Sequence, residues 1–412
     1  MASKTKNVRA KPLLTLTYAN WQKVRFGDVV REVKDTVDRD TTDLTRFIAG
    51  EHMGSEDLHL RTWGDINGDY LGPAFHRIFR KGQVLYGSRR TYLKKVAVAS
   101  FDGICANTTF VLESRDPDVL LPELLPFVML TDAFTQHSVR ESKGSVNPYI
   151  NWKDIAKYEF LLPPKDEQRR IADILWAADE SVEAFRTVLA NLKSLGDTKA
   201  FAVFSTEKEG LDSAKITMSL SELAEIRYGL TVDGTRRKLQ RSLPYLRVAN
   251  VHRGKLDLSE IKEIGADDQD LQECALRNND VLVVEGHADP TEIGRAAIWQ
   301  GEIDDCLHQN HILRVRTSND LLPHYLLAFL NSPKGKSHIR RCAKSSSGLY
   351  TINSTVLREM QIPIQSIDHQ KEVVDNIEAI HRRVREVEKH LVYVTNMKNR
   401  IVRKLLDGHN VH

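Results

Sequence analysis

Residues 166–204 have the sequence DEQRRIADILWAADESVEAFRTVLANLKSLGDTKAFAVF, and the prediction of the fold starts from this stretch. Apolar or small side chains recur along it in alternating steps of four and three residues, which is the heptad pattern of a helix that packs along one seam. A helix of this length extends about 60 Å, more than a compact domain needs. We therefore expect a spacer helix whose seam consists of Ile171, Leu175, Ala178, Val182, Phe185, Leu189 and Leu192.

The same seam returns later in the chain, with each position 202 residues after its counterpart. An ordinary core helix of a bundle is the alternative interpretation, but the length and the repeated register favour a pair of spacer helices. Trp176 lies just off the first seam, where it either widens the buried face or offers a docking point for another protein. The second seam consists of Val373, Ile377, Ile380, Val384, Val387, Leu391 and Val394.

The segments before the two long helices are duplicated as well, and an internal repeat of this size decides the architecture. Asn151 and Gln168 of the first copy correspond to Asn353 and Gln370 of the second. Strand and turn patterns recur in the same order, so we predict a mixed α/β unit followed by a long helix, present twice. The paired segments are 142–170 with 345–373, 80–99 with 277–298, and the proline-containing helical patterns 120–134 with 321–335.

Boundaries between these parts follow from local signals. Pro163 and Pro164 disfavour helix before the first long helix, and Asp166 or Asp368 can cap a helix start. Gly408 is a candidate residue for ending the second helix. We expect the helices to pair as an antiparallel coiled coil between two similar globular domains, which gives the chain a pseudo-two-fold axis. The predicted parts are a globular domain at 1–164, a spacer helix at 165–205, a linker at 206–217, a second globular domain at 218–366 and a second spacer helix at 367–412.

Composition narrows the class of protein. A chain of 412 residues with 41% hydrophobic content is long enough for about two to three domains. No apolar run approaches the roughly 18 residues of a membrane span, and no signal segment follows the basic first residues, so we expect a cytoplasmic protein without membrane contact. The four cysteines lack CxxC spacing, which argues against a disulfide framework and a cysteine-rich zinc module. The net charge of +3 is small, so any nucleic-acid surface has to come from local basic patches.

Three motifs together resemble one known family, the specificity subunits of type I restriction-modification enzymes. They are FLLPPKDEQRRIADIL at 160–175, its weaker copy QIPIQSIDHQKEVVDNI at 361–377, and VLYGSRRTYLKKVAVASFDGICANTTFVL at 84–112. The resemblance covers nearly the whole chain. The second copy departs from the pattern, because it has His369 where the first has a glutamate and Gln365-Ser366 in place of two prolines.

The resemblance implies that each globular domain is a target recognition domain for one half of an asymmetric, bipartite sequence in double-stranded DNA. The helices would set the gap between the halves and dock partner subunits. Such a subunit is not an enzyme and has no cofactor of its own. Its implied partners are two methyltransferase subunits, which use S-adenosylmethionine to methylate adenine, and two endonuclease and translocase subunits, which use ATP and Mg²⁺.

Four loops combine glycine or serine with Arg, Lys, Asn and Tyr, at 87–92, 140–145, 234–241 and 340–350. Small residues let the backbone approach phosphates, Arg and Lys neutralise them, and Arg or Asn can recognise purine edges in the major groove. The alternative is that most of these charges are solvated surface. We predict the following DNA-binding residues: Ser88, Arg89, Arg90, Tyr92, Lys94, Lys143, Gly144, Ser145, Tyr149, Arg236, Arg237, Lys238, Arg241, Arg340, Arg341, Lys344, Ser346, Ser347 and Tyr350.

Catalytic and metal motifs are weak by comparison. Residues 147–150, Asn-Pro-Tyr-Ile, are one proline short of an adenine methyltransferase loop, and no glycine-rich S-adenosylmethionine loop or P-loop accompanies them. Cys306, His308 and His311, with His287, have unconvincing spacing for zinc. We therefore expect no catalytic residue and no metal ligand. Two alternatives remain open, a self-contained DNA adenine methyltransferase and a non-catalytic coiled-coil scaffold with two globular heads that binds no nucleic acid.

Overall fold

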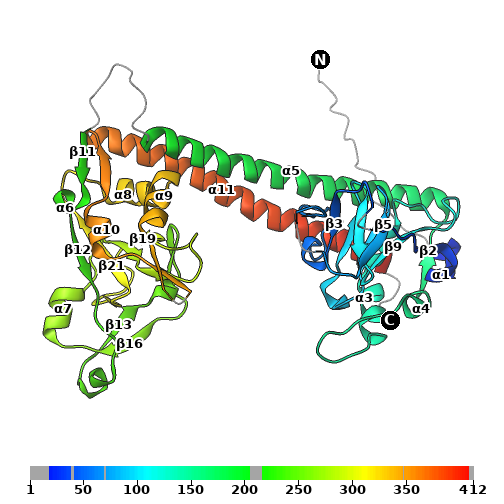
Figure 1. Ribbon diagram of the computed structural model, residues 1–412, viewed down its shortest axis with the longest axis horizontal. Coiled ribbons are helices and arrows are strands. Elements are labelled where there is room, and N and C mark those ends of the chain that lie inside the picture. Colours follow the sequence, from blue (N-terminus) through cyan, green and yellow to red (C-terminus); the bar gives the residue numbers. More distant parts are fainter. Residues whose placement is uncertain (1–17, 39–40, 69–70, 205–215, 347, 408–412) are drawn as a thin grey trace, which may run out of the picture. The chain divides into compact units, whose positions relative to one another are not determined.

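Two long helices lie where the heptad pattern predicts them, α5 at Lys165–Phe204 and α11 at Ile367–Val402 (Figure 1). The computed structural model describes residues 18–38, 41–68, 71–204, 216–346 and 348–407. These residues form two compact units: unit 1 consists of the described residues within 1–185 and 390–412, and unit 2 of those within 186–389. Each long helix contributes a part to both units.

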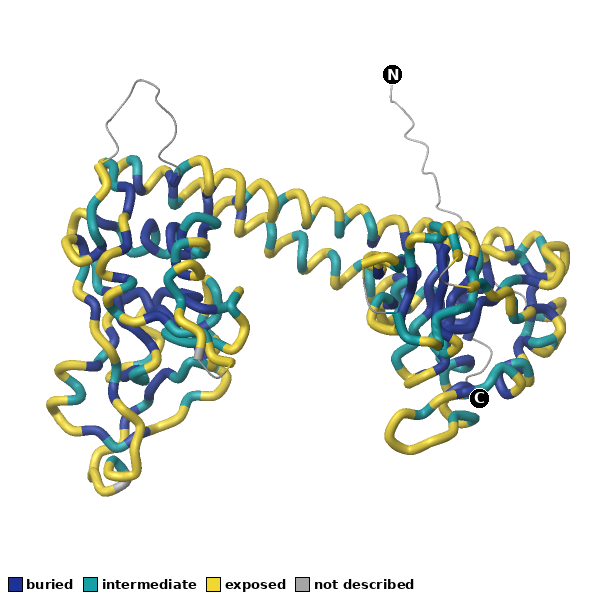
Figure 2. The backbone as a smooth tube through the Cα atoms, in the orientation of Figure 1, coloured by how far each residue is buried: buried dark blue, intermediate teal, exposed yellow. Residues whose placement is uncertain are grey.

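Unit 1 is centred on a four-stranded sheet in the order β2-β9-β6-β7, in which every neighbouring pair is antiparallel. Successive side chains of a strand point to opposite faces. In β6, Tyr86 accordingly joins one buried cluster with Phe110 and Leu112, whereas Leu85 joins another with Val111. Both faces are therefore covered, and Figure 2 shows these strands as buried. The strands are β2 (Val30–Val33), β6 (Val84–Gly87), β7 (Val96–Val98) and β9 (Thr109–Ser114).

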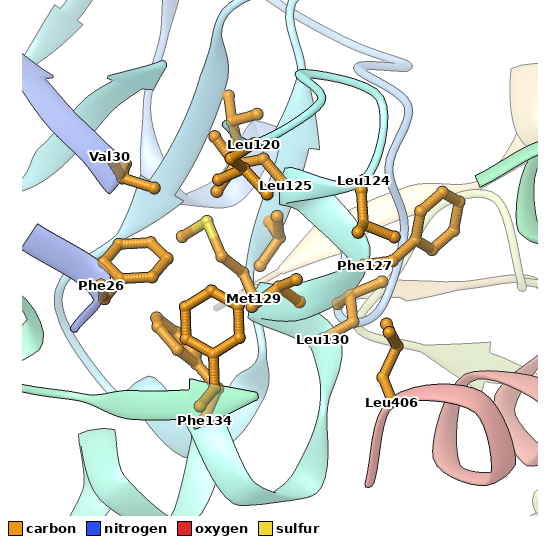
Figure 3. Packing of buried hydrophobic residues seen from close by; sticks show 14 of the residues in the cluster. Phe26, Val30, Leu120, Leu124, Leu125, Phe127, Met129, Leu130, Phe134 and Leu406 are labelled. Carbon is orange, nitrogen blue, oxygen red and sulfur yellow. The ribbon is translucent and has the colours of Figure 1, made fainter. Parts of the chain in front are cut away.

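Helices cover one face of this sheet. Phe127 and Met129 of α2 and Phe134 of α3 pack into the same cluster as Phe26 (Figure 3). Leu406, from the turn that follows α11, reaches this cluster beside Leu130. The elements are α1 (Phe26–Val29), α2 (Leu125–Leu130), α3 (Asp132–Arg140), α4 (Trp152–Ile155) and η6 (Arg403–Asp407).

A second sheet, in the order β4-β3-β8-β5, lies against the other face, and its only parallel pair among the described strands is β3 with β8. A separate antiparallel pair, β1 with β10, sets Gln22 opposite Leu162 just before α5 begins. The strands are β1 (Gln22–Arg25), β3 (Arg46–Ile48), β4 (Gly64–Asp65), β5 (Phe75–Phe79), β8 (Gly103–Ala106) and β10 (Glu159–Leu162).

Unit 2 repeats this plan. Its central sheet has the order β12-β21-β17-β19, which corresponds strand for strand to β2-β9-β6-β7, and β11 pairs with β24 as β1 does with β10. The corresponding elements are β11 (Ile216–Ser219), α6 (Leu220–Leu223), β12 (Ala224–Tyr228), β17 (Val281–Val284), β19 (Ala296–Ile298), β21 (Ile312–Thr317), α8 (Pro323–Asn331), α9 (Pro333–Cys342), α10 (Ser354–Arg358) and β24 (Gln361–Ile364).

The remaining strands of unit 2 form three small sheets. One has the order β16-β13-β20 and occupies the place of the second sheet of unit 1, another pairs β14 with β15, and the third has the order β18-β23-β22. These elements are β13 (Ser242–Leu246), β14 (Val251–His252), β15 (Lys255–Leu256), β16 (Lys262–Gly265), α7 (Asp268–Cys274), β18 (Gly286–His287), β20 (Leu307–His308), β22 (Lys344–Ser346) and β23 (Leu349–Thr351).

Two segments differ from the predicted pattern in the same way. Each of the stretches 120–134 and 321–335 forms two helices instead of one, because a hydroxyl side chain caps a new helix in the middle. Thr131 accepts a hydrogen bond from the backbone N–H of Phe134 (3.2 Å), and Ser332 accepts one from Gly335 (3.1 Å).

The long helices run antiparallel within each unit. Residues later in α5 contact residues earlier in α11, as antiparallel helices require. In unit 1, Asp179 contacts Lys398 and the ring of Phe185 stacks on His390. In unit 2, Lys193 pairs with Glu388 at 2.9 Å. Along the predicted seams, Ile171, Leu175, Val182, Val373, Ile377 and Ile380 are buried, and Ala178, Phe185, Leu189, Leu192, Val384, Val387, Leu391 and Val394 are half-buried.

The shared glutamine of the two helix starts has one structural role in both copies. The buried amide of Gln168 accepts from the N–H of Leu121 (2.9 Å) and donates to the carbonyls of Val119 and Pro163. Gln370 makes the same three bonds with Leu322, Asp320 and Gln365. The amide therefore ties the start of each long helix to the loop before α2 or α8.

The fold class predicted from the sequence is confirmed: a mixed α/β chain with an internal repeat and two long helices. Trp176 packs against its own unit, with its ring on Phe127 and its N–H on the carbonyl of Glu123 (2.9 Å), so it widens the buried face. Gly408 and most of the predicted linker 206–217 lie outside the described residues. None of the described helices is long and apolar enough to cross a membrane.

Candidate nucleic-acid interface

Two of the predicted loops of unit 1 meet through their backbones. The residues at 143–149 form a closed loop, since Lys143 and Tyr149 exchange both backbone hydrogen bonds (2.7 and 2.9 Å). Beside it runs the loop after β6, where the N–H of Arg90 donates to the carbonyl of Pro148 (2.7 Å) and Arg89 bridges to Tyr149. We call residues 87–92 and 143–149 the unit 1 loop surface.

Several side chains of this surface are open to solvent. Arg89 and Arg90 are exposed, and Tyr92 and Tyr149 are 56% and 42% exposed. Arg89 forms no ion pair with any residue that the structure describes, and the guanidinium of Arg90 donates to the amide oxygen of Asn147 (3.3 Å). Lys143 and Ser145 are exposed as well, although Lys143 approaches Asp154 at 3.4 Å. Gly144 has a φ of +86°, a left-handed conformation that glycine adopts without strain.

Two predicted residues of unit 1 have other roles. The hydroxyl of Ser88 is buried and donates to the carbonyl of Thr108 (2.6 Å). The side chain of Lys94 is 13% exposed, and its ammonium group lies between Asp132 (2.6 Å) and Glu56 (3.1 Å). Burial alone would lower the pKa of Lys94, but the hydrogen bonds to these two carboxylates outweigh it and raise the pKa. Both residues are therefore removed from the predicted DNA contacts.

Unit 2 brings the corresponding segments together as a small sheet. Strand β23 pairs with β22 on one side and with β18, which follows the central strand β17, on the other. Tyr350 sits in the middle of this arrangement, opposite His287 and Ser345, and is half-buried. Arg340, Arg341 and Lys344 lead into it, are exposed, and have no carboxylate partner among the residues described. These residues form the unit 2 loop surface, at 286–291 and 340–351.

The other predicted loop of unit 2, at 234–241, is neutralised by acids. The side chain of Arg236 is 17% exposed, and its guanidinium makes a bidentate ion pair with Asp270 of α7 (2.6 and 3.0 Å), which is the main cause of the raised pKa of Arg236. Arg241 pairs with Asp268 and Asp305. Both are therefore removed from the predicted contacts, whereas Lys238 is exposed. The side chains of Arg237 and Ser346, and the whole of Ser347, lie outside the described part of the chain.

The histidines weighed as zinc ligands each have a partner of their own. Burial lowers the pKa of His308 to about 4, and its Nδ1–H donates to the carbonyl of Cys274 (2.8 Å). His311 pairs with Glu285 (2.7 Å), and burial raises the pKa of the Cys306 thiol to about 12. Within residues 18–407, gaps excepted, no three His, Cys, Asp or Glu side chains gather as a metal ion requires.

A groove of about 770 Å³ in unit 2 runs beside the long helices. Its lining mixes Arg253 and Arg385 with Asp197 and Glu378, so it offers neither a uniform charge nor a paired acid and base. Catalysis usually needs such convergent groups. The loop surfaces, with their unpaired cations, are therefore the stronger candidate site.

A comparison with protein families matches residues 18–194 to the type I restriction modification DNA specificity domain. Among curated proteins, the chain is 25% identical over 313 residues to the type I restriction enzyme EcoKI specificity subunit of Escherichia coli strain K12, covering 70% of this chain and 67% of that protein. It is 29% identical over 183 residues to the EcoDI specificity subunit of Escherichia coli, covering 43% of this chain and 39% of that protein.

Residues 18–194 thus match a type I restriction modification DNA specificity domain, and the chain is similar to type I restriction enzyme specificity subunits. These relatives are named as specificity subunits, and nothing in the comparisons supports the self-contained methyltransferase.

Two solved structures share the fold. One, from a study of complex assembly and conformational transition of the type I restriction-modification system, aligns over 94% of this chain and 97% of that chain with a TM-score of 0.59 and 18% identity. The other is the specificity subunit from M. genitalium, which aligns over 96% and 98% with a TM-score of 0.51 and 15% identity. At these identities the likeness concerns the fold alone.

Sequence patterns missed two exposed side chains of the unit 1 loop surface, Val146 and Asn147. Both lie between the predicted residues Ser145 and Tyr149. The signal available was their position in a glycine-containing loop between a lysine and a tyrosine, but the expected contacts were limited to charged, aromatic and small residues.

Proposed function

We propose that each unit of the chain recognises one half of a bipartite site in double-stranded DNA through its loop surface. One observation carries the proposal: the same backbone arrangement recurs in both units, and in both it displays cations that no described carboxylate neutralises. Unpaired arginine and lysine side chains, here on loops and, for Arg340 and Arg341, in the last turn of α9, are suited to phosphates and to the acceptor edges of guanine.

The proposed contacts are the exposed members of the predicted set. In unit 1 they are Arg89, Arg90, Tyr92, Lys143, Gly144, Ser145 and Tyr149. In unit 2 they are Lys238, Arg340, Arg341 and Lys344, to which we add the half-buried Tyr350. Arg237, Ser346 and Ser347 remain predictions from the sequence. The two loop surfaces differ in length and in residues, so the two half-sites should differ in sequence.

The long helices supply the second part of the proposed function. We propose that the paired seams set the gap between half-sites, with centres about 34 Å, or one DNA turn, apart. We further propose that two methyltransferase subunits and two endonuclease subunits assemble with the chain in the cytoplasm. S-adenosylmethionine, ATP and Mg²⁺ would be bound by those partners.

Fluorescence anisotropy with mixed duplexes at several salt concentrations tests DNA binding. Each phosphate contact that is lost reduces the salt slope by about one. We expect the double variants Arg89→Ala with Arg90→Ala, and Arg340→Ala with Arg341→Ala, to weaken binding and lower the slope by about two. Arg31→Ala is the matched control, because this exposed arginine of unit 1 is held by Glu113.

Unchanged slopes in both double variants would contradict the assigned contacts. Absence of salt-dependent binding by the wild-type chain would favour the scaffold without nucleic acid, because release of counterions accompanies binding to DNA. The two outcomes separate an error in the residues from an error in the function.

A further inference from the structure

Val146 is an aliphatic side chain placed almost entirely in water. It is 93% exposed, whereas no other large apolar side chain in the described residues exceeds 63%. It lies at the tip of the closed loop 143–149, between Gly144 and Asn147. Exposed valines are common singly, but this one stands on a surface of unpaired cations proposed to face DNA.

The tip is held in place by its backbone. Lys143 and Tyr149 close the loop, the N–H of Arg90 binds the carbonyl of Pro148, and the side chain of Arg90 binds the amide oxygen of Asn147. Valine is branched at Cβ, so its side chain adds little rotational freedom. The loop therefore holds the two methyl groups of Val146 in a defined position, where they do not pack into the protein core.

An aliphatic side chain has one complement on the edges of base pairs. In the major groove the 5-methyl group of thymine is the apolar feature, while the minor groove displays hydrogen-bonding groups. Cations beside the tip would bind the flanking phosphates and bring the loop against the groove. The hairpin of unit 2 also displays an aliphatic residue, Leu349, which is 44% exposed.

We propose that Val146 determines specificity by contacting the 5-methyl group of a thymine in the half-site of unit 1. This inference rests on the proposed function and adds one chemical requirement to it: the half-site of unit 1 contains a thymine whose methyl group contributes to binding.

The test needs the recognised motif, obtained by mapping methyladenine in cells that express the full chain with its methyltransferase. Each thymine of the half-sites is then replaced by deoxyuridine, which removes only the methyl group, and affinity is measured by anisotropy. We expect one substitution in one half-site to weaken binding about fourfold, the factor for losing one buried methyl-sized group. With Val146→Ala, that substitution should have no further effect.

Val392→Ala is the matched control, since Val392 is 62% exposed on α11 and should leave the deoxyuridine penalty intact. A unit 1 half-site without thymine overturns the inference, as does a penalty that persists in Val146→Ala. In either case salt-dependent binding to DNA would still support the proposed function. Absence of any DNA binding overturns both.

Discussion

Gln168 and Gln370 are the smallest units in which the repeat can be seen. Each buried amide makes three hydrogen bonds to backbone groups, so its removal leaves an N–H and two carbonyls without partners. We expect Gln168→Ala to lower the free energy of unfolding of unit 1 by about 2–4 kcal/mol, and Gln370→Ala to do the same for unit 2.

The change in the free energy of unfolding is measured by urea unfolding, with hydrogen exchange used to monitor each unit separately. Gln269→Ala in α7 is the control, because the exposed Gln269 side chain bonds only Glu273 within its own helix and should change stability by about 0.5 kcal/mol or less. Equal small effects at all three positions would show that the amides do not anchor the long helices.

A partly buried ion pair in unit 1, between His59 and Asp179, makes the stability of this unit depend on pH. The Nε2 of His59 lies 2.7 Å from Asp179, whose other oxygen is 2.9 Å from the buried ammonium of Lys398. The hydrogen bond to Asp179 is the main cause of the raised pKa of His59. Burial alone would raise the pKa of Asp179, but His59 and Lys398 together lower it.

The sign follows from linkage. A histidine with a raised pKa stabilises the folded state fully below its unfolded pKa of about 6.5, and this contribution is lost as pH rises through the folded pKa. The contribution of Asp179 is lost only when pH falls below about 4. We therefore expect His59→Gln to lower the urea midpoint of unit 1 more at pH 5.5 than at pH 9.

The urea midpoint of each variant, measured at pH 5.5 and at pH 9, checks this expectation. His76→Gln is the control, since the ring of His76 contacts the carbonyl of Pro73. A midpoint difference for His59→Gln that is the same at both pH values would refute the contribution of the ion pair.

At the residue scale, loop composition predicted where charge gathers but not which charges are free. Lys94 is neutralised by Glu56 and Asp132, and Arg236 by Asp270. In the sequence, these carboxylates lie between 34 and 38 residues away from the lysine or arginine with which they pair. No local pattern links such positions, because the sheets and α7 bring them together.

At the scale of elements, apolar periodicity predicted the long helices well, because a heptad seam of this length is compatible with one structure, a long helix that packs along the seam. The breaks at Thr131 and Ser332 were missed, since apolar residues continue on both sides and a single hydroxyl decides the cap. The hairpins of the loop surfaces were expected only as loops, because their pairing depends on a strand edge supplied by another segment.

Two helical glycines should respond to alanine with opposite signs. In α5, a Cβ on Gly196 would meet only Ile380, at 3.4 Å, and alanine favours helix over glycine. We expect Gly196→Ala to stabilise unit 2 by about 0.5–1 kcal/mol. In α9, a Cβ on Gly335 would lie 2.2 Å from the carbonyl oxygen of Phe329, so Gly335→Ala should destabilise the same unit.

Thermal unfolding of the two variants provides the comparison, and each serves as control for the other because both keep the helix and change one methyl group. A decrease in stability for Gly196→Ala would mean that α5 and α11 pack more tightly than their contact at Ile380 indicates.

For the whole molecule, the repeat itself was predictable, because a constant offset of 202 residues joins the two seams and leaves few arrangements. If the helices set the gap, lengthening both should change the gap alone. Twenty-one residues inserted after Ala190 and after Glu386 would add about 32 Å to each helix. This is close to the 34 Å of one DNA turn, so we expect a gap longer by about nine base pairs.

Methyladenine mapping measures both the gap and the half-sites. A seven-residue insertion at the same positions is the control, because it adds about 10 Å and turns the second half-site to another side of the duplex, which should reduce methylation. Half-sites altered in sequence by the longer insertion would contradict the role of the helices as spacers.

Unit 1 consists of two separate segments of the chain, so its core can be completed only late in synthesis. Val402, Leu405 and Leu406 fill its core, and the carboxylate of Asp407 accepts from the N–H groups at the start of α3 (2.8 and 3.3 Å). Unit 2 is a continuous stretch of chain, whereas unit 1 waits for residues beyond 390. At about 5–20 residues per second, the ribosome needs roughly 10 to 40 s to supply them after residue 185. The unit that emerges first therefore spends that interval with part of its core uncovered, within reach of chaperones and proteases.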